Sequence, residues 1–311
     1  MSTYATAVTR AEMNNGVLQT WLNRMVLENF EPNLYFYKAG TKPTIPSGYN
    51  TVGWAKFTQI DEDSVTAGAT DTDGVSPTPI EFNATVITAT PVQYRVVVSL
   101  SDMLIELNVI NFLKGAAVEV GSAMARRIDK VIQTTIMAGT YVKYATGSAR
   151  TGLAATNILT ASLLNQASAI LESRYAPKID GYYVAYAHPF QIADLRSESG
   201  TGNWLEVNKY ATPDKIFKGE IGMLNNVRVI MAPFIQYFSS TVNVYPCLVL
   251  GAGAYGVAEF QTLKTYVTPA VPSDSDPLAQ RRKVGAKVAF AAKILQQAAM
   301  LRIETGVTAI V

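Results

Sequence analysis

Residues 251–256 read Gly-Ala-Gly-Ala-Tyr-Gly, which has the spacing Gly-x-Gly-x-x-Gly of a dinucleotide-binding loop and follows an apolar run ending at Leu250. In a true nucleotide loop, backbone amides at the start of the next helix hold the pyrophosphate. Here the following residues, 257–268, are rich in β-branched and aromatic types and favour a strand. We therefore expect a strand and a turn with no cofactor, and keep nicotinamide or flavin dinucleotide binding as an alternative.

The other candidates for chemistry are single residues. The sequence has one histidine, His188, so paired-histidine zinc motifs are impossible and any Ser-His-Asp arrangement would have to use this imidazole. Pro189 follows it and predicts a strand-to-helix turn. The one cysteine, Cys247, lies in an apolar run and is expected to be a buried structural thiol. We therefore predict no catalytic residue, no metal site and no enzymatic activity.

The composition of the 311 residues points to association with other subunits. Hydrophobic residues make up 49% and charged residues only 16%, which is too apolar for a disordered chain and sparse for the surface of a monomer. The net charge of +2 argues against a chain built around polyanion binding. The N-terminus lacks the pattern of a signal peptide, and no stretch is long and apolar enough to predict a membrane span.

The elements that would position any site follow in order along the chain. Residues 1–45 are predicted to be an arm with a short amphipathic helix centred on Trp21, which docks on another surface. Residues 50–100 are predicted to form one long hairpin, with a strand at 51–60 and a return strand at 80–100. Apolar residues then recur every three or four positions from Leu113 to Ala138, which predicts one long helix ended by Gly139.

The second half of the chain mixes predicted helices and strands. Helical patterns cover residues 163–172 and 189–196, whereas residues 181–187, 227–231 and 242–250 have the composition of strands. Apolar residues alternate over 287–297 and 299–303, which predicts two further strands at the C-terminus. The fold class predicted from these patterns is α+β.

Charge is unevenly distributed between the hairpin and the C-terminal strands. Between residues 61 and 106, eight acidic residues face one basic residue, a net charge of −7: Asp61, Glu62, Asp63, Asp71, Asp73, Glu81, Asp102 and Glu106 against Arg95. Between residues 281 and 304, six basic residues face one acidic residue, a net charge of +5: Arg281, Arg282, Lys283, Lys287, Lys293 and Arg302 against Glu304. Because an isolated two-stranded ribbon is marginally stable, we predict that the hairpin lies across the basic strands of a neighbouring copy.

The order of these pieces resembles the major capsid proteins of tailed bacteriophages with the HK97-like fold. The most specific stretch, Asp-Pro-Leu-Ala-Gln-Arg-Arg-Lys-Val-Gly-Ala-Lys at 276–287 with its continuation to Glu304, resembles the C-terminal signature of the family typified by the phage N4 major capsid protein. Residues 187–196 and 250–256 agree with that resemblance. In that family, the glycine-rich turn belongs to a strand-and-turn element.

The resemblance implies five segments. Residues 1–45 would be the N-terminal arm, 46–100 the extended hairpin loop, 101–154 the peripheral domain with its spine helix, 155–265 the axial domain, and 266–311 the return to the peripheral domain.

The implied function is a subunit that assembles with itself, as hexamers and pentamers, into an icosahedral virion shell around phage DNA. Assembly would take place in the host cytoplasm, with a portal, a separate scaffold and decoration proteins as further partners. DNA would be contacted non-specifically at most, and no membrane would be involved. The residues expected at contacts between subunits are Trp21, Asp61, Glu62, Asp63, Asp71, Asp73, Arg281, Arg282, Lys283 and Lys287. An encapsulin-like compartment shell is the alternative with the same fold, and a decoration or tail protein is a further one that the long helix disfavours.

Overall fold

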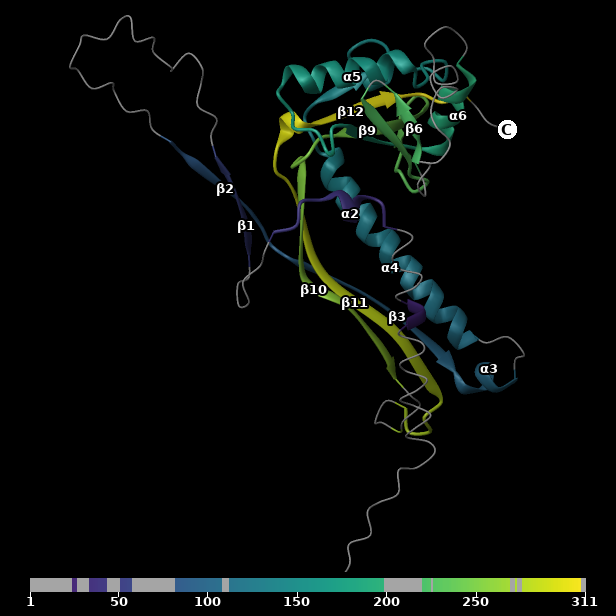
Figure 1. Cartoon of the computed structure of the whole chain (residues 1–311). Coiled ribbons are helices and arrows are strands. Elements are labelled where there is room, and N and C mark those ends of the chain that lie inside the picture. The colour runs from purple at the N-terminus through teal and green to yellow at the C-terminus, as the bar shows by residue number, and fades with distance from the viewer. Residues whose placement is uncertain are drawn as a thin grey trace, which may run out of the picture.

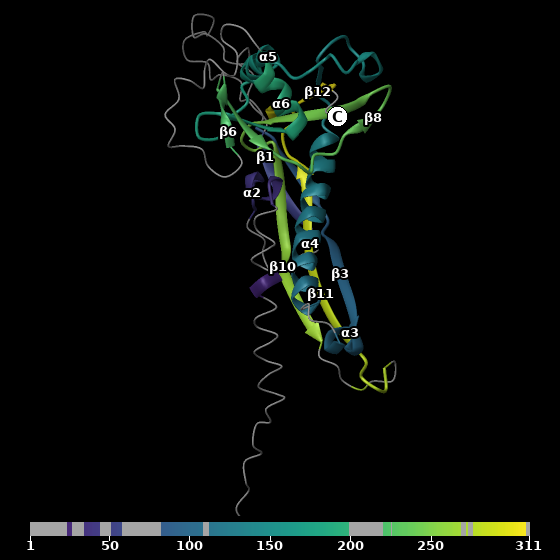
Figure 2. The same cartoon turned by 90° about the vertical axis from the view of Figure 1, so that its right-hand side faces the viewer.

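A long helix lies along a narrow sheet of three long strands, and a wider sheet lies at one end of both (Figures 1 and 2). The structure is a computed structural model and describes residues 24–26, 34–43, 51–57, 82–107, 112–198, 220–224, 226–268, 272 and 276–308. Apolar residues of the helix, the narrow sheet and the wide sheet belong to one continuous hydrophobic core. The long helix, the narrow sheet and the wide sheet are therefore parts of one packed body.

The long helix, α4, spans Phe112–Met137, which confirms the predicted helix to within a residue at each end. Its buried positions follow the predicted stripe from Leu113 to Ile128, but then continue through Ile132 and Ile136. The predicted positions Val131 and Thr135 are only half-buried. An ideal helix has 3.6 residues per turn, so a stripe drifts around its axis and the buried face changes register over a length of 26 residues.

The narrow sheet has the strand order β10-β11-β3, and all its neighbours are antiparallel. Strand β3 spans Val92–Ser101, β10 spans Tyr255–Thr268 and β11 spans Arg281–Ile294. Helix α4 covers one face of this sheet, as Figure 2 shows. The short helix α3, Asp102–Leu107, continues directly from β3.

The prediction that residues 50–100 form one long hairpin is partly wrong. Strand β1, Val52–Phe57, does pair with β2, Ala84–Ala89, to form a two-stranded ribbon. The predicted return strand, however, is divided at Pro91, and its second half is β3, which pairs with β11. Proline has no backbone N–H for a ladder and favours a break between strands at this point.

The wide sheet has the order β4-β12-β9-β5-β7-β6, with β8 paired to β9 outside this path. Helices α5 and α6 lie beside it in Figure 1. The predicted strands and helices of this region are confirmed to within about two residues. The bounds are β4 Val142–Tyr144, α5 Ala161–Ser173, β5 Tyr183–Ala187, α6 Pro189–Ser197, β6 Glu220–Leu224, β7 Val227–Met231, β8 Phe238–Ser239, β9 Asn243–Leu250 and β12 Met300–Thr305.

The C-terminal residues are divided between the two sheets. The segment 266–311 was predicted to be the C-terminal return to the peripheral domain, and its strand β11 packs against α4. Strand β12, in contrast, lies between β9 and β4 in the wide sheet. All but one of its residues are buried, and only a place inside that sheet covers both of its faces.

Part of the predicted arm is described. The helical residues 24–26 lie against α4, where a β-carbon on Gly121 would fall 2.5 Å from the carbonyl oxygen of Val26. The arm continues through helix α2, Phe36–Ala39. Trp21 lies outside the described residues. Of the helices that are described, none has the length and apolar character that crossing a membrane requires.

Candidate inter-subunit surface

The narrow sheet has one face that α4 does not cover, and we call it the open face. Side chains alternate along each strand, so Tyr94 of β3 and Phe290 of β11 point toward α4, with their rings 5.2 Å apart. Their neighbours in sequence point the other way. At the open face, Gln93 Nε2 donates a hydrogen bond of 3.5 Å to Gln261 Oε1 across the small residue Ala289. The strand register therefore places residues from all three strands on this surface.

A row of three cations crosses the open face. Lys287 of β11 is directly opposite Lys264 of β10 on one side and Arg95 of β3 on the other. The Lys287 ammonium also lies 5.1 Å from the centre of the Tyr266 ring. We call Lys264, Lys287 and Arg95 the cation row. In the part of the chain that the structure describes, no ion pair involving these three residues is found.

Like charges directly opposite each other in a sheet repel and destabilise the pairing. The cation row therefore has a physical reason to bind an anionic partner. Lys287 was predicted as a contact residue, whereas Arg95 and Lys264 were not. Arg95 was counted as a lone base within the acidic segment, and only the pairing of β3 with β11 brings it to the basic side. The alternation of β3 could have indicated its face but not its neighbour.

The other predicted cations of β11 are placed on both faces. Arg281 and Lys283 share the open face with Lys287, since they are separated from it by even numbers of residues. Arg282 points to the opposite face and is half-buried. Arg281 also forms an ion pair with Asp276, with the Arg281 Nε atom 3.8 Å from Oδ2, so part of its charge is already balanced.

Several predicted contact residues cannot be placed. Asp61, Glu62, Asp63, Asp71 and Asp73 lie outside the described residues, as does Trp21.

Two residues of the basic segment belong to a different site. Arg302 and Glu304 lie on β12 in the wide sheet, where they form an ion pair with each other. They therefore contribute nothing to the open face.

The base of the β1–β2 ribbon docks on the same chain. Trp54 is buried in a small cluster with Val52, Ala89, Ala258 and Ala291, beside the end of the open face. The opposite side of the ribbon has no such cover. Phe57 and Phe82 stack with their ring centres 5.3 Å apart and are 62% and 61% exposed, and the nearby Val86 is 58% exposed. An apolar surface of this kind on a two-stranded ribbon is typical of an interface.

The residues that suggested chemistry have structural roles. Strand β10 follows the glycine-rich turn directly, as predicted, and the Trp54 indole covers Gly256 at its end. His188 begins α6 as its N-cap, where its Nδ1 atom accepts a hydrogen bond of 3.3 Å from the Phe190 N–H. Burial lowers the pKa of His188 below its usual value of 6.5, and burial raises the pKa of the Cys247 thiol to about 12. The neutral forms of both side chains are therefore favoured.

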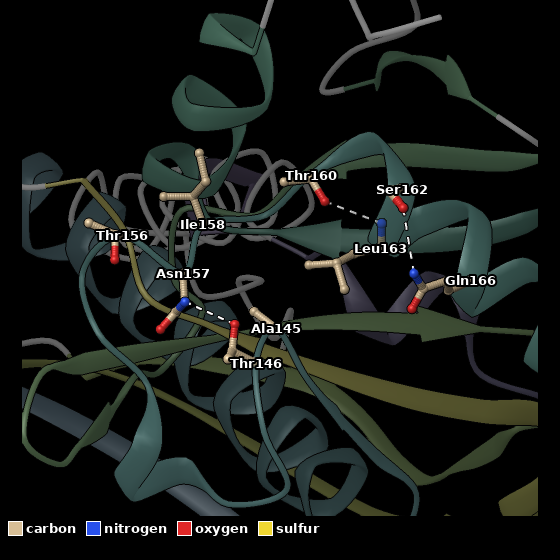
Figure 3. A pocket seen from close by; sticks show the side chains of 9 residues that line it. All are labelled: Ala145, Thr146, Thr156, Asn157, Ile158, Thr160, Ser162, Leu163 and Gln166. Carbon is tan, nitrogen blue, oxygen red and sulfur yellow. Dashed lines mark hydrogen bonds between the residues drawn. The ribbon is translucent and has the colours of Figure 1, made fainter.

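A pocket of about 290 Å³ lies beside the start of α5 (Figure 3). The side chains that line it carry no titratable group, and several of its polar groups are hydrogen-bonded to one another. Asn157 Nδ2 donates to Thr146 Oγ1 at 2.9 Å, and the Leu163 N–H donates to the N-cap oxygen of Thr160 at 3.3 Å. The described residues also contain no cluster of His, Cys, Asp and Glu that could hold a metal ion. The pocket thus provides no group for acid–base chemistry.

Comparisons with solved structures show what fold this is. The chain is similar to the capsid protein of Ralstonia phage GP4, with 14% identity, a TM-score of 0.71, and coverage of 99% of this chain and 95% of that one. It is also similar to the capsid protein of cyanophage Pam1, with 12% identity, a TM-score of 0.70, and coverage of 91% and 93%. The capsid protein of cyanophage P-SCSP1u gives 15% identity, a TM-score of 0.61, and coverage of 98% and 92%. The predicted HK97-like fold is therefore confirmed.

A protein-family model matches part of the chain. The model of the phage capsid protein family matches residues 128–259, which include the last ten residues of α4 and most of the wide sheet. No curated protein matches the sequence. The prediction of a tailed-phage major capsid protein is confirmed at this level, whereas the narrower family typified by phage N4 stays a prediction. The matched family and fold are those of structural proteins, and a capsid protein is a virion component that assembles with copies of itself.

Proposed function

We propose that the protein is the subunit of an icosahedral shell that encloses phage DNA, forms hexamers and pentamers, and catalyses no reaction. Assembly would take place in the host cytoplasm, with a portal, a separate scaffold and decoration proteins as further partners. The predicted arm would keep that role, with the β1–β2 ribbon as the extended loop, α4 and the narrow sheet as the peripheral domain with β11 as the C-terminal return, and the wide sheet as the axial domain. The observation that carries the contact between subunits is the cation row on the open face.

The partner that suits the cation row is the acidic tip of the ribbon from a second copy. Residues 61–81 contain six acidic residues and no basic one. The open face presents Arg95, Lys264 and Lys287 in one line, with Lys283 and Arg281 farther along β11. Complementary charge of this kind fixes the register between partners and disfavours wrong pairings.

The apolar side of the ribbon supports the same contact. Val97 on β3 is 64% exposed on the open face, near Tyr266 of β10, and could pack against the Phe57–Phe82 side of another ribbon. Apolar contact would supply the binding energy, and the charges would set the position. The ribbon would lie across the face of the sheet, because the cation row runs across all three strands and not along one edge.

The test begins with electron microscopy of the expressed protein, for which we expect regular shells, tubes or capsomers. Reversing Lys264 and Lys287 to Glu is expected to prevent shell closure, or to make closure require high salt that screens the new repulsion from the acidic tip. A second change, Asp61→Lys with Asp63→Lys, should restore assembly in that background. The matched control is Lys130→Glu, on the exposed side of α4.

Three results would count against the proposal in different ways. A wild-type protein that stays monomeric under all assembly conditions would contradict the shell function. Shells that form equally well with reversed and native cations across a salt series would contradict the contact alone. Purified particles that hold protein cargo and lack packaged DNA would favour the encapsulin-like compartment.

A further inference from the structure

A buried carboxylate on α4 holds the turn that begins α2. Asp129 is almost completely buried, and its Oδ2 atom accepts hydrogen bonds from the backbone N–H groups of Tyr35, at 2.5 Å, and Phe36, at 3.4 Å. Its Oδ1 atom accepts a third, from the Tyr37 N–H at 3.2 Å. Asp129 thus caps a helix that is more than 90 residues away in sequence, whose own preceding residue provides no side-chain cap.

The same short segment is bound to β10. The Tyr255 hydroxyl donates a hydrogen bond of 2.5 Å to the Phe36 carbonyl oxygen. Both backbone groups of Thr41 then bond to β10. The Thr41 N–H donates to the Tyr255 carbonyl oxygen, and the Thr41 carbonyl oxygen accepts from the Val257 N–H, each at 3.0 Å. Tyr37 adds a side-chain hydrogen bond from its hydroxyl to the Glu259 carboxylate.

A third contact reaches the wide sheet. The Phe36 ring is buried, with its centre 4.6 Å from that of Tyr186 on β5. One segment of ten residues, 34–43, therefore touches the long helix, the narrow sheet and the wide sheet (Figure 1). An isolated helix of four residues is not stable in water, so α2 exists because these three elements hold it.

We propose that residues 34–43, held by Asp129, act as a clamp that fixes the angle between α4 and the wide sheet and thereby sets the curvature of the shell. The role in curvature rests on the proposed shell function. The wide sheet lies at one end of α4 and the narrow sheet, and the angle at this junction can change unless a bridging element resists the bending. The clamp bridges this junction with buried polar contacts. A buried carboxylate that loses its amide partners would be left unsatisfied, so opening the clamp is unfavourable.

The first measurement is hydrogen exchange of the soluble subunit or capsomer, which does not require shells. Asp129→Asn is expected to speed the exchange of the amides of residues 35–37 by about tenfold or more, the change that loss of one hydrogen bond to a charged group produces. Tyr255→Phe removes only the hydroxyl donor to Phe36 and gives a milder second variant that keeps the fold. Glu119→Gln, on the exposed side of the same helix, is the matched control and should leave this exchange unchanged.

The second measurement is the distribution of particle diameters by cryo-electron microscopy. We expect both clamp variants to broaden or shift the distribution relative to the wild type and to Glu119→Gln. Unchanged exchange at residues 35–37 in both variants would overturn the clamp. Faster exchange with an unchanged diameter distribution would overturn its role in curvature. A wild type that forms no shell would contradict the proposed function, and the exchange experiment would still decide whether the clamp exists.

Discussion

The Trp54 indole lies so close to Gly256 that a β-carbon on this glycine would fall 2.6 Å from Trp54 Cε2. No side chain fits at position 256 unless Trp54 moves. The last glycine of the Gly-x-Gly-x-x-Gly motif is therefore the position on which Trp54 of the β1–β2 ribbon packs. The spacing that suggests a nucleotide loop therefore has a packing explanation at this position.

We predict that Gly256→Ala lowers the free energy of unfolding by about 1–3 kcal/mol, the usual cost of overpacking. Urea denaturation followed by tryptophan fluorescence would measure it. Gly115→Ala on α4 is the control, because a β-carbon there meets no atom within 4 Å. Alanine at that exposed helical position should raise stability by up to about 1 kcal/mol. Equal effects at both positions would contradict the role of Gly256.

His188 is expected to give the protein a pH-dependent stability. Its Nδ1 atom must be unprotonated to accept the Phe190 N–H, and burial lowers its pKa in the folded state. Its contribution is therefore fully present above the unfolded pKa of about 6.5 and is lost as the pH falls through the lower folded value.

The variant His188→Asn replaces the imidazole Nδ1 acceptor with an amide oxygen, which can also cap the helix and does not titrate at these pH values. Denaturation midpoints measured against pH should therefore fall less steeply for this variant than for the wild type below about pH 6.5. Identical slopes in the two proteins would show that this imidazole does not titrate between the folded and unfolded states.

Local patterns predicted most elements of the fold. The long helix was predictable because apolar residues repeat at three and four positions over 26 residues, and the strands Val227–Met231 and Asn243–Leu250 because they are short β-branched runs. The roles of His188 and of the glycine-rich turn also followed from their immediate neighbours.

Pairing between distant segments was not predictable. The alternation of Tyr94, Val96 and Val98 indicates that β3 has a buried face, but it does not reveal that the partner is β11, nearly two hundred residues later. The cation row depends on the pairing of β11 with β3, which places Arg95, and with β10, which places Lys264, and so both residues were missed. Asp129 was missed for the same reason, since a single acid on a helix does not indicate which distant amides it caps.

Cys247 is expected to be inert until the protein unfolds. The thiol is fully buried on β9, and burial raises its pKa to about 12, so almost no thiolate forms near neutral pH. A thiol reagent should label no cysteine in native buffer and one per chain in urea, with a rate that follows global unfolding. Rapid labelling of the native protein would contradict the burial of this strand.

Glu304 is a buried carboxylate that forms ion pairs with two arginines, and its loss is expected to lower the stability of the fold strongly. Its side chain is 0% exposed, and Arg150 binds it with two hydrogen bonds, from Nε to Oε2 and from the second guanidinium nitrogen to Oε1, each 2.7 Å long. Arg302 Nε lies 2.8 Å from Glu304 Oε1 as an ion pair, without the alignment of a hydrogen bond. The Arg150 guanidinium also lies 3.6 Å from the centre of the Phe238 ring. One buried carboxylate thus balances two arginines that join β12 to β8 and to the 3-10 turn at Arg150–Gly152.

Glu304→Gln keeps the shape of the side chain but leaves both guanidinium groups without a counter-charge. We expect the free energy of unfolding to fall by about 3–5 kcal/mol, the cost of breaking a buried ion pair from one side. Glu119→Gln is the control, because its ion pair with Arg126 is exposed and should contribute less than about 1 kcal/mol. Urea denaturation of the two variants compares them directly, and a loss for Glu304→Gln as small as that for Glu119→Gln would mean that water screens the cluster despite its burial.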